Sequence, residues 1–281
     1  MRKFILLIVV GFCLLSDVHA QPVTPVNEEL LATEKILKVL SDSIIRGSTD
    51  IVRRAAVAEF NERMLDLLKK PASFSYPFDS IKALSKLRTS DNRTRIYTWF
   101  HQSRDDGTYR YFGLIQRFNP AKTEMRLIGL IEKKCDNDTI EMKELNSDSW
   151  MGAVYYDLIE KKVKSGYHYY LLGWIGHDRY TTRKVLEVLT FDRYDNVAFG
   201  APVFIDEKSK KKWREVFEFT AEAVMLLRYE KKKKMFVFDH LSPASPSAKG
   251  QFRYYGPDFT IDGYRYKKGL WYYKSNLDMR N

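Results

Sequence analysis

The chain has 281 residues, of which 44% are hydrophobic and 14% aromatic, and its formal net charge is +11. This length suits one large domain with a substantial core, and the many aromatic side chains suit broad, half-buried β sheets. No stretch after residue 20 is apolar enough to span a bilayer, which excludes a later membrane anchor.

Residues 1–20 have the three parts of a cleavable secretory signal. Two basic residues precede the almost wholly apolar run Phe4–Leu15, and small residues at Val18 and Ala20 occupy the positions that a signal peptidase inspects. The apolar run is shorter than the roughly 20 residues that a bilayer crossing needs. We therefore expect an exported protein, periplasmic or extracellular, whose mature chain begins near Gln21. An uncleaved anchor, or a lipid on Cys13, is the alternative.

The two cysteines exclude an intramolecular disulfide in the mature chain. Cys13 would leave with the signal, and Cys135 would remain alone in a polar, lysine-containing segment. Neighbouring lysines lower the pKa of a thiol, so Cys135 could be reactive, but an incidental surface cysteine is the simpler interpretation.

The region 21–90 is expected to be helical and to pack on the main domain. Apolar residues recur at helical spacing over 30–44 and again over 52–68, on either side of Gly47. Ser48 or Thr49 suits the cap of the second helix, and Pro71 suits its end. The short connection predicts an antiparallel helical hairpin.

From residue 91 to 281 the pattern changes to short strand-like segments rich in aromatic and β-branched residues. Arg95–Gln102, Thr108–Phe118 and Glu124–Lys133 predict a three-stranded antiparallel meander. Residues 153–162 permit a helix or a strand, and we favour the strand. The further strand candidates are Tyr167–Ile175, Arg183–Asp192, Ala198–Phe204, Trp213–Phe219, Ala223–Tyr229, Met235–Asp239, Tyr264–Lys267 and Leu270–Tyr273.

Nothing helix-like alternates with these strands, so parallel βαβ winding is disfavoured. The sequence instead predicts an α+β fold, in which the helical hairpin precedes a large antiparallel β domain folded as a sandwich, a barrel or a curved sheet. Within Tyr167–Ile175, large side chains cover both faces, with Tyr169 and Leu171 on one and Tyr170 and Leu172 on the other. This segment is therefore expected to be a central strand between two packed layers.

The chain carries none of the common catalytic or nucleotide-binding motifs: no GxSxG, HExxH, Walker loop or dinucleotide fingerprint. No two of the histidines after the predicted signal lie three to five residues apart, the spacing that helical metal pairs use. We predict no metal and no cofactor. Whether the protein is an enzyme stays open.

Two polar clusters are weak candidates for catalysis. Asp239 and His240 lie at the end of a predicted strand, where a site is plausible, although such pairs more often cap a turn. His177 and Asp178 follow two glycines and Trp174 in a segment that suits either a ligand-contacting loop or a tight turn. A hydrolase would require these four residues to converge in one pocket.

Surface aromatic rings could instead bind a glycan. Trp174, Tyr255 and Trp271 are the candidates, and the hypothesis requires at least two of them on one solvent-facing groove.

Basic residues cluster in two places, Lys208–Lys212 with Arg214, and Lys231–Lys234. Lysines at hairpin tips normally stay solvated and protect sheet edges. Otherwise the positive charge favours an anionic partner in the cell envelope, such as phospholipid head groups or acidic glycans. Nucleic acid is disfavoured because no nucleic-acid-binding module accompanies the charge.

Several short stretches of the chain are also found together in a known group of proteins. These are Phe78-Asp79-Ser80, Asp106–Gly113, Tyr169–Trp174, Glu187–Asp192, Phe238–Leu241, Tyr255–Asp258 and Asp278–Asn281. In this combination the chain resembles a group of uncharacterised exported bacterial proteins, over most of its mature length. The resemblance implies a bacterial, periplasmic setting, and it implies no activity, cofactor or site.

The leading functional hypothesis is an exported, non-catalytic protein of the cell envelope that binds a ligand or partner of unknown identity. It rests on the predicted signal, the β-rich body, the lysine clusters and the missing catalytic motifs. A hydrolase with an unfamiliar site and a glycan-binding module are the alternatives.

Overall fold

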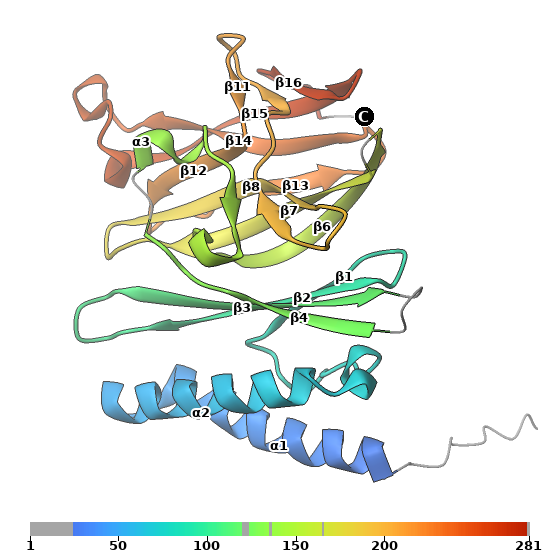
Figure 1. Ribbon diagram of the computed structural model, residues 1–281. Helices are drawn as coiled ribbons and strands as arrows, with labels where there is room; N and C mark the ends of the chain where they lie inside the picture. The colour runs from blue at the N-terminus through green and yellow to red at the C-terminus, as the bar shows by residue number, and fades with distance from the viewer. Residues whose placement is uncertain (1–24, 120–123, 135–136, 165, 280–281) are drawn as a thin grey trace, which may run out of the picture.

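The structure, a computed structural model, describes residues 25–119, 124–134, 137–164 and 166–279. The predicted export signal and Cys135 lie outside the described residues. Figure 1 shows four stacked layers, a helical hairpin followed by three β sheets. The prediction of an α+β fold with an N-terminal helical hairpin and a large, mainly antiparallel β region is confirmed, and the β region is built as stacked sheets.

The helical hairpin consists of α1 (Pro25–Arg46) and α2 (Asp50–Leu68). Thr49 is the N-cap of α2: its backbone is extended, and its side-chain oxygen accepts a hydrogen bond from the Val52 amide at 3.3 Å. A short 3-10 turn, Pro71–Phe74, follows α2. Among the described residues, no helix is both long and apolar enough to cross a membrane.

The first sheet lies directly on the helical hairpin. Its strands are β1 (Ser85–Arg88), β2 (Thr94–Gln102), β3 (Tyr109–Asn119) and β4 (Glu124–Leu130), hydrogen-bonded in that order and all antiparallel. The expected meander is therefore present, with β1 added at its edge. Because side chains alternate along a strand, Tyr97, Trp99 and Leu114 pack against the helices, while Ile96 and Ile115 face the next sheet.

The middle sheet is covered on both faces. Its strands are β5 (Leu145–Asn146), β6 (Val154–Val163), β7 (Gly166–Gly176), β8 (Thr181–Phe191), β9 (Val197–Phe199) and β12 (Arg214–Thr220). Hydrogen bonding runs β5-β9-β8-β7-β6, and β12 pairs with β8. The strand favoured over 153–162 is confirmed as β6.

The outer sheet completes the stack. Its strands are β10 (Phe204–Ile205), β11 (Lys211–Lys212), β13 (Leu227–Glu230), β14 (Met235–Pro243), β15 (Tyr255–Lys267) and β16 (Leu270–Lys274). They run in the order β11-β10-β16-β15-β14-β13, and β10 is parallel to β16. Short helical turns lie between the strands, among them α3 (Asn137–Ile140).

Strand β7 is the central strand that its sequence predicts. Tyr169 and Leu171 belong to the core between the first and middle sheets, whereas Tyr170 and Leu172 belong to the core between the middle and outer sheets. The large apolar side chains on both faces of β7 are thereby removed from water. This burial of apolar surface is the main stabilising contribution in such stacks.

The basic group near residue 210 is not a single solvated patch. Arg214 is completely buried: its Nε lies 2.6 Å from Glu187 Oε1, and its other guanidinium nitrogens donate to backbone carbonyls, including that of Phe199 at 2.9 Å. Lys212 forms ion pairs with Glu141 at 3.0 Å and Glu215 at 2.9 Å. Arg214 and Lys212 therefore neutralise carboxylates within the fold, those of Glu187, Glu141 and Glu215. The Lys231–Lys234 group lies in the turn between β13 and β14, as expected for a hairpin tip.

Candidate functional site

A cavity of about 270 Å³ lies between the first and middle sheets. Sheet-to-sheet cores are normally filled, so a hollow lined by polar side chains at this level is a candidate binding site. The residues that matter for its chemistry are Tyr109, Tyr111, Glu132, Lys134, His177 and Arg183.

Close contact between two loops builds one wall of this cavity. A Cβ atom on Gly176 would come within 2.3 Å of the Tyr109 ring, so only glycine at the end of β7 lets the ring approach the backbone. Arg179 Nη2 then donates to the Asp105 carbonyl oxygen at 3.0 Å, which ties the β7–β8 turn to the β2–β3 turn. The two turns therefore hold Tyr109 in a fixed place.

His177 and Arg183 supply the polar wall. Arg183 Nε donates to Glu218 Oε2 at 2.8 Å, and Arg183 Nη2 lies 2.9 Å from His177 Nε2. A guanidinium can only donate, so His177 Nε2 accepts, and the neutral ring carries its proton on Nδ1. Burial and the nearby Arg183 charge lower the pKa of the His177 imidazole, which agrees with a neutral ring that offers one N–H donor.

Glu132 and Tyr111 form the floor on the side of the first sheet. Glu132 Oε2 accepts from the Tyr111 amide at 3.0 Å, and the Tyr111 hydroxyl donates to the Gly176 carbonyl at 3.0 Å. Burial raises the pKa of the Glu132 carboxyl above its usual value. Glu132 is thus a hydrogen-bonding group whose ionised form is disfavoured by burial.

A second, smaller depression of about 190 Å³ adjoins the first, and Tyr109 lines both. Trp174, Asp178 and Lys184 belong to this second lining. The rings of Phe100, Tyr109 and Trp174 pack together, with centroids 5.2–5.8 Å apart. Both hollows have mixed polar and apolar linings, and Tyr109 belongs to both, so we call the two linings together the Tyr109 site.

The sequence-predicted pair His177 and Asp178 lies at the Tyr109 site, but the two side chains serve different purposes. Asp178 Oδ1 accepts from the backbone amides of Tyr180 and Thr181, both at 2.7 Å, and so shapes the turn. Those hydrogen bonds lower the pKa of the Asp178 carboxyl, against the opposing effect of its partial burial. His177 alone of the pair faces the first cavity.

Asp239 and His240 lie on another sheet, in β14, and their side chains have different hydrogen-bond partners. Asp239 Oδ2 accepts from the Leu226 amide at 2.7 Å, whereas His240 Nδ1 lies 2.6 Å from Asp262 Oδ2 on β15. The buried Asp262 carboxylate also accepts from the Tyr273 hydroxyl. The four catalytic candidates are therefore held as two separate groups, and the cavity that His177 lines contains neither Asp239 nor His240.

The three aromatic candidates for glycan binding are also dispersed. Trp174 is half-buried at the Tyr109 site. Trp271 is completely buried in the core between the middle and outer sheets, where it cannot meet a ligand. Tyr255 is half-buried near Phe252, and its hydroxyl accepts from the Gly250 amide at 2.9 Å.

Tyr109, Tyr111, Glu132 and Arg183 are site residues that the sequence did not single out. The alternation of β3 places both tyrosines on one face beside the Asp105-Asp106-Gly107 turn, which was a usable signal. Nothing in the local sequence indicates that Glu132, which follows β4, and Arg183 of β8 meet at the same cavity. Within the described ranges, no group of three or more His, Cys, Asp or Glu residues could hold a metal ion.

The Tyr109 site therefore belongs to a layered α+β protein with a mixed aromatic and polar cavity between two sheets. Comparison with protein-family models, curated proteins and solved structures gave no match to this chain.

Proposed function

We propose that this protein is an exported, non-catalytic binding protein of the cell envelope, and that its ligand is a neutral polyhydroxylated molecule, a glycan, held at the Tyr109 site. The observation that carries the proposal is that Tyr109 lines two neighbouring hollows whose linings mix polar and apolar side chains. Sugar rings present an apolar C–H face and a rim of hydroxyls. An aromatic face flanked by donors and acceptors matches both properties.

The charge balance of the site favours a neutral ligand over an anion. Arg183 is already paired with Glu218, and His177 is held neutral by burial and by that same guanidinium. The remaining groups offer hydrogen bonds of both kinds: the His177 N–H donates, and the Glu132 carboxyl accepts. Lys134 lines the larger hollow and Lys184 the smaller one, and each of these cations shares its lining with a carboxyl group, Glu132 and Asp178 respectively. A phosphate or a carboxylate would therefore meet charges of both signs, whereas hydroxyl groups can exchange hydrogen bonds with each of these side chains.

The same contacts argue against glycoside hydrolysis. That reaction uses two carboxyl groups on either side of the scissile bond. In the part of the chain that the structure describes, Glu132 is the one carboxyl that lines the larger cavity. Asp178 lines the smaller hollow, and its carboxylate already accepts hydrogen bonds from the backbone amides of its own turn. Binding without turnover is the function that these residues support best.

The envelope location is supported by the sequence. Residues 1–20 predict an export signal, and the +11 charge of the chain favours an anionic surrounding such as the bacterial envelope. Glycans are abundant in that compartment, so location and ligand class agree with each other.

Isothermal titration of the mature chain tests the proposal, with cellotetraose, chitotetraose and maltotetraose as neutral probes and tetragalacturonate as the anionic one. We expect at least one neutral tetrasaccharide to bind more tightly than the anionic one. Tyr109→Ala should weaken that binding about tenfold, since an aromatic contact contributes on the order of 1 kcal/mol.

Tyr194→Ala is the matched control, because Tyr194 is exposed on the β8–β9 turn and lines neither hollow. It should bind as the unaltered protein does. If none of the neutral probes binds, or if Tyr109→Ala binds them undiminished while circular dichroism shows a folded protein, the glycan proposal is rejected.

A further inference from the structure

Another cavity, distinct from both hollows of the Tyr109 site, lies between the helical hairpin and the first sheet and has a volume of about 300 Å³. Ile44 of α1, Phe60 of α2 and Trp99 of β2 give it an apolar wall. Such a volume is at the lower end of the roughly 300–1,000 Å³ found for small-molecule pockets. The space between the first two layers is therefore hollow at a place where a purely structural core would be filled.

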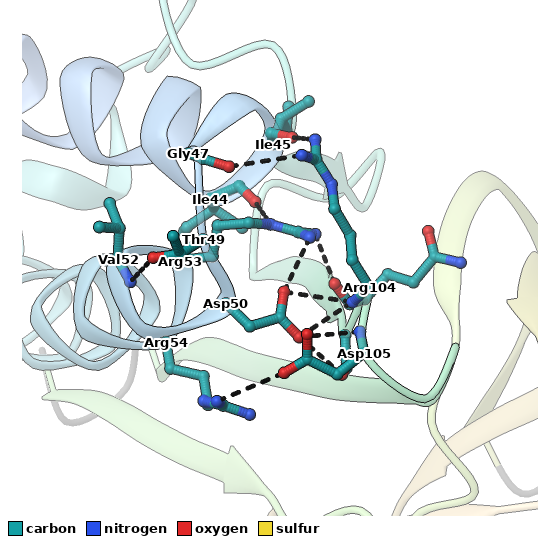
Figure 2. A network of polar contacts seen from close by, with 12 residues as sticks. Ile44, Ile45, Gly47, Thr49, Asp50, Val52, Arg53, Arg54, Arg104 and Asp105 are labelled. Carbon is teal, nitrogen blue, oxygen red and sulfur yellow. Dashed lines mark hydrogen bonds and ion pairs between the residues drawn. The ribbon is translucent and has the colours of Figure 1, made fainter.

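A network of polar contacts lies at the edge of this cavity, where Arg53 and Arg104 belong to its lining (Figure 2). The Asp50 carboxylate accepts hydrogen bonds from the Ser103 hydroxyl at 2.7 Å and from the Arg104 amide at 3.0 Å, which clamps the start of α2 to the β2–β3 turn. Arg53 pairs with Asp50 at 3.1 Å, and its Nε donates to the Ile44 carbonyl at 2.8 Å. The helices and the sheet are thus fixed at this edge independently of what fills the cavity.

Arg104 brings an unneutralised positive charge to the same edge. Its guanidinium donates to the carbonyl oxygens of Ile45, at 3.0 Å, and Gly47, at 3.5 Å, and forms no ion pair with a carboxylate of the described residues. Figure 2 shows the Arg104 side chain extended towards these carbonyls. By contrast, the charge of Arg53 is balanced by Asp50. An exposed guanidinium beside an apolar hollow presents a charge to an anion whose other part is apolar.

An exposed apolar side chain lies beside the Arg104 guanidinium. Ile45, whose carbonyl oxygen accepts from Arg104, also lines the cavity and is 51% exposed. An aliphatic side chain next to a cationic group is typical of surfaces that meet amphiphiles.

We propose that this cavity binds a single acyl chain, whose anionic head group, a carboxylate or a phosphate, pairs with Arg104. A water-sized group takes up about 30 Å³ in a liquid, and a methylene is of similar size, so the cavity has room for about ten carbons. The chain lies against Phe60 and Trp99, and the head group stays at the solvent-facing edge. This ligand differs from the one at the Tyr109 site in chemistry and in place, so either proposal can fail alone.

The test uses contact quenching of tryptophan fluorescence by bromine. Trp99 is the tryptophan in the cavity lining, and a bromine atom on a bound chain would lie against its ring. We expect 12-bromododecanoate, below its micellar concentration, to quench the emission saturably. Trp99→Phe should abolish that saturable quenching, while calorimetry with unlabelled dodecanoate still detects binding.

Three further variants test which residues bind the head group and which bind the chain. Arg104→Gln should weaken dodecanoate binding about tenfold, the range of one charge-assisted hydrogen bond, and Arg104→Lys should restore most of it. Ala83→Phe, which adds a ring at a position in the lining, should block binding by filling the space. Arg193→Gln is the control, because Arg193 lies over the Tyr194 ring on another layer, and should change nothing.

A second arm distinguishes the source of the chain, with vesicles that carry bromine-labelled phosphatidylglycerol. Quenching of Trp99 by the free acid alone supports a soluble amphiphile, and quenching by the vesicles supports a chain drawn from a membrane lipid. If neither probe quenches Trp99, or if Ala83→Phe and Arg104→Gln bind dodecanoate as the unaltered protein does, the proposal is overturned.

Discussion

At the scale of single residues, the Arg214–Glu187 pair shows that a charged residue can be buried although its sequence neighbours predict a solvated surface. Arg214 follows a run of lysines, yet its side chain lies in the core. Both side chains are completely buried in the middle sheet, and the Tyr155 hydroxyl donates to Glu187 at 2.5 Å. Every charged atom of the pair is therefore matched by a counter-charge or a hydrogen bond. Removing one partner from such a pair leaves a buried charge without compensation, which is far more costly than losing a surface ion pair.

Arg214→Met should lower the free energy of unfolding by about 3–5 kcal/mol, because Glu187 is then left buried and unpaired. Urea unfolding followed by circular dichroism measures this change. The double variant Arg214→Met with Glu187→Gln should recover part of the loss, since it also removes the orphaned charge.

Arg193→Met is the control, because Arg193 is exposed, and its effect should stay within about 0.5 kcal/mol. An Arg214→Met protein as stable as this control would show that the buried pair does not stabilise the middle sheet.

Residue-level chemistry was only partly predictable from the sequence. The structure places His177 in the lining of the first cavity. The sequence left open whether its segment is a ligand-contacting loop or a tight turn, because glycines and a turn-forming aspartate suit both. The pairing of His240 with Asp239 was the natural guess from adjacency, yet successive residues of a strand point to opposite faces. The partner of His240 is Asp262, which comes from the neighbouring strand 22 residues later.

At the scale of elements, the helical hairpin is attached to the first sheet by one carboxylate as well as by its apolar face. Asp50, in the first turn of α2, accepts hydrogen bonds from Ser103, Arg104 and Asp105 of the β2–β3 turn. The hydrogen bond from Ser103, together with those from the two backbone amides and the Arg53 charge, holds the pKa of Asp50 well below its usual value.

This lowered pKa makes the docking of the hairpin sensitive to acid. A carboxyl with a depressed pKa in the folded state stabilises the fold above its unfolded pKa, and the stabilisation is lost as the pH falls towards the folded pKa. Between pH 6 and pH 3 the melting temperature should therefore fall more steeply for the unaltered protein than for Asp50→Asn.

Thermal unfolding at half-unit pH steps measures these slopes, with Glu62→Gln on the exposed face of α2 as the control. Identical slopes for Asp50→Asn and the unaltered protein would contradict a role for the Asp50 carboxylate in attaching the hairpin.

Both helices, their connection and most strands follow from local pattern. The helical period of apolar residues, Thr49 as a cap and the turn residues between strands act over a few positions and are visible in the sequence. Strand β1 was missed because Ser85–Arg88 has no alternation of its own and becomes a strand by pairing with β2. Pairing partners lie outside the window in which a local pattern can be recognised.

At the scale of the whole molecule, the order of the layers could not be predicted. The sequence indicated that β7 is covered on both sides, but it did not say which strands cover it. Those contacts join residues far apart in the chain, for example the Tyr170 ring with the Trp271 ring, at 5.4 Å between centroids. The cavities lie between layers, so they too depend on long-range packing.

The export of the molecule is a prediction for the full chain. Expressed in a bacterium with residues 1–20 intact, it should appear in the periplasmic fraction or the medium with Gln21 as its first residue, because the signal peptidase cuts after the small residue Ala20. Intact-mass spectrometry of the fractions measures the cut. Changing Ala20 to Arg should block processing, whereas Asp17→Asn should not; recovery of the uncut chain of 33.1 kDa from the cytosol would contradict export.

The central claim, that a glycan binds between the first and middle sheets, is tested most directly by hydrogen–deuterium exchange with and without the neutral tetrasaccharide that binds most tightly. Amides buried or hydrogen-bonded by a ligand exchange more slowly. We predict slower exchange over 108–111 and 175–184, with no change over 255–274 in the outer sheet. Slower exchange confined to the outer sheet, or no change at all at saturating saccharide, would contradict the account.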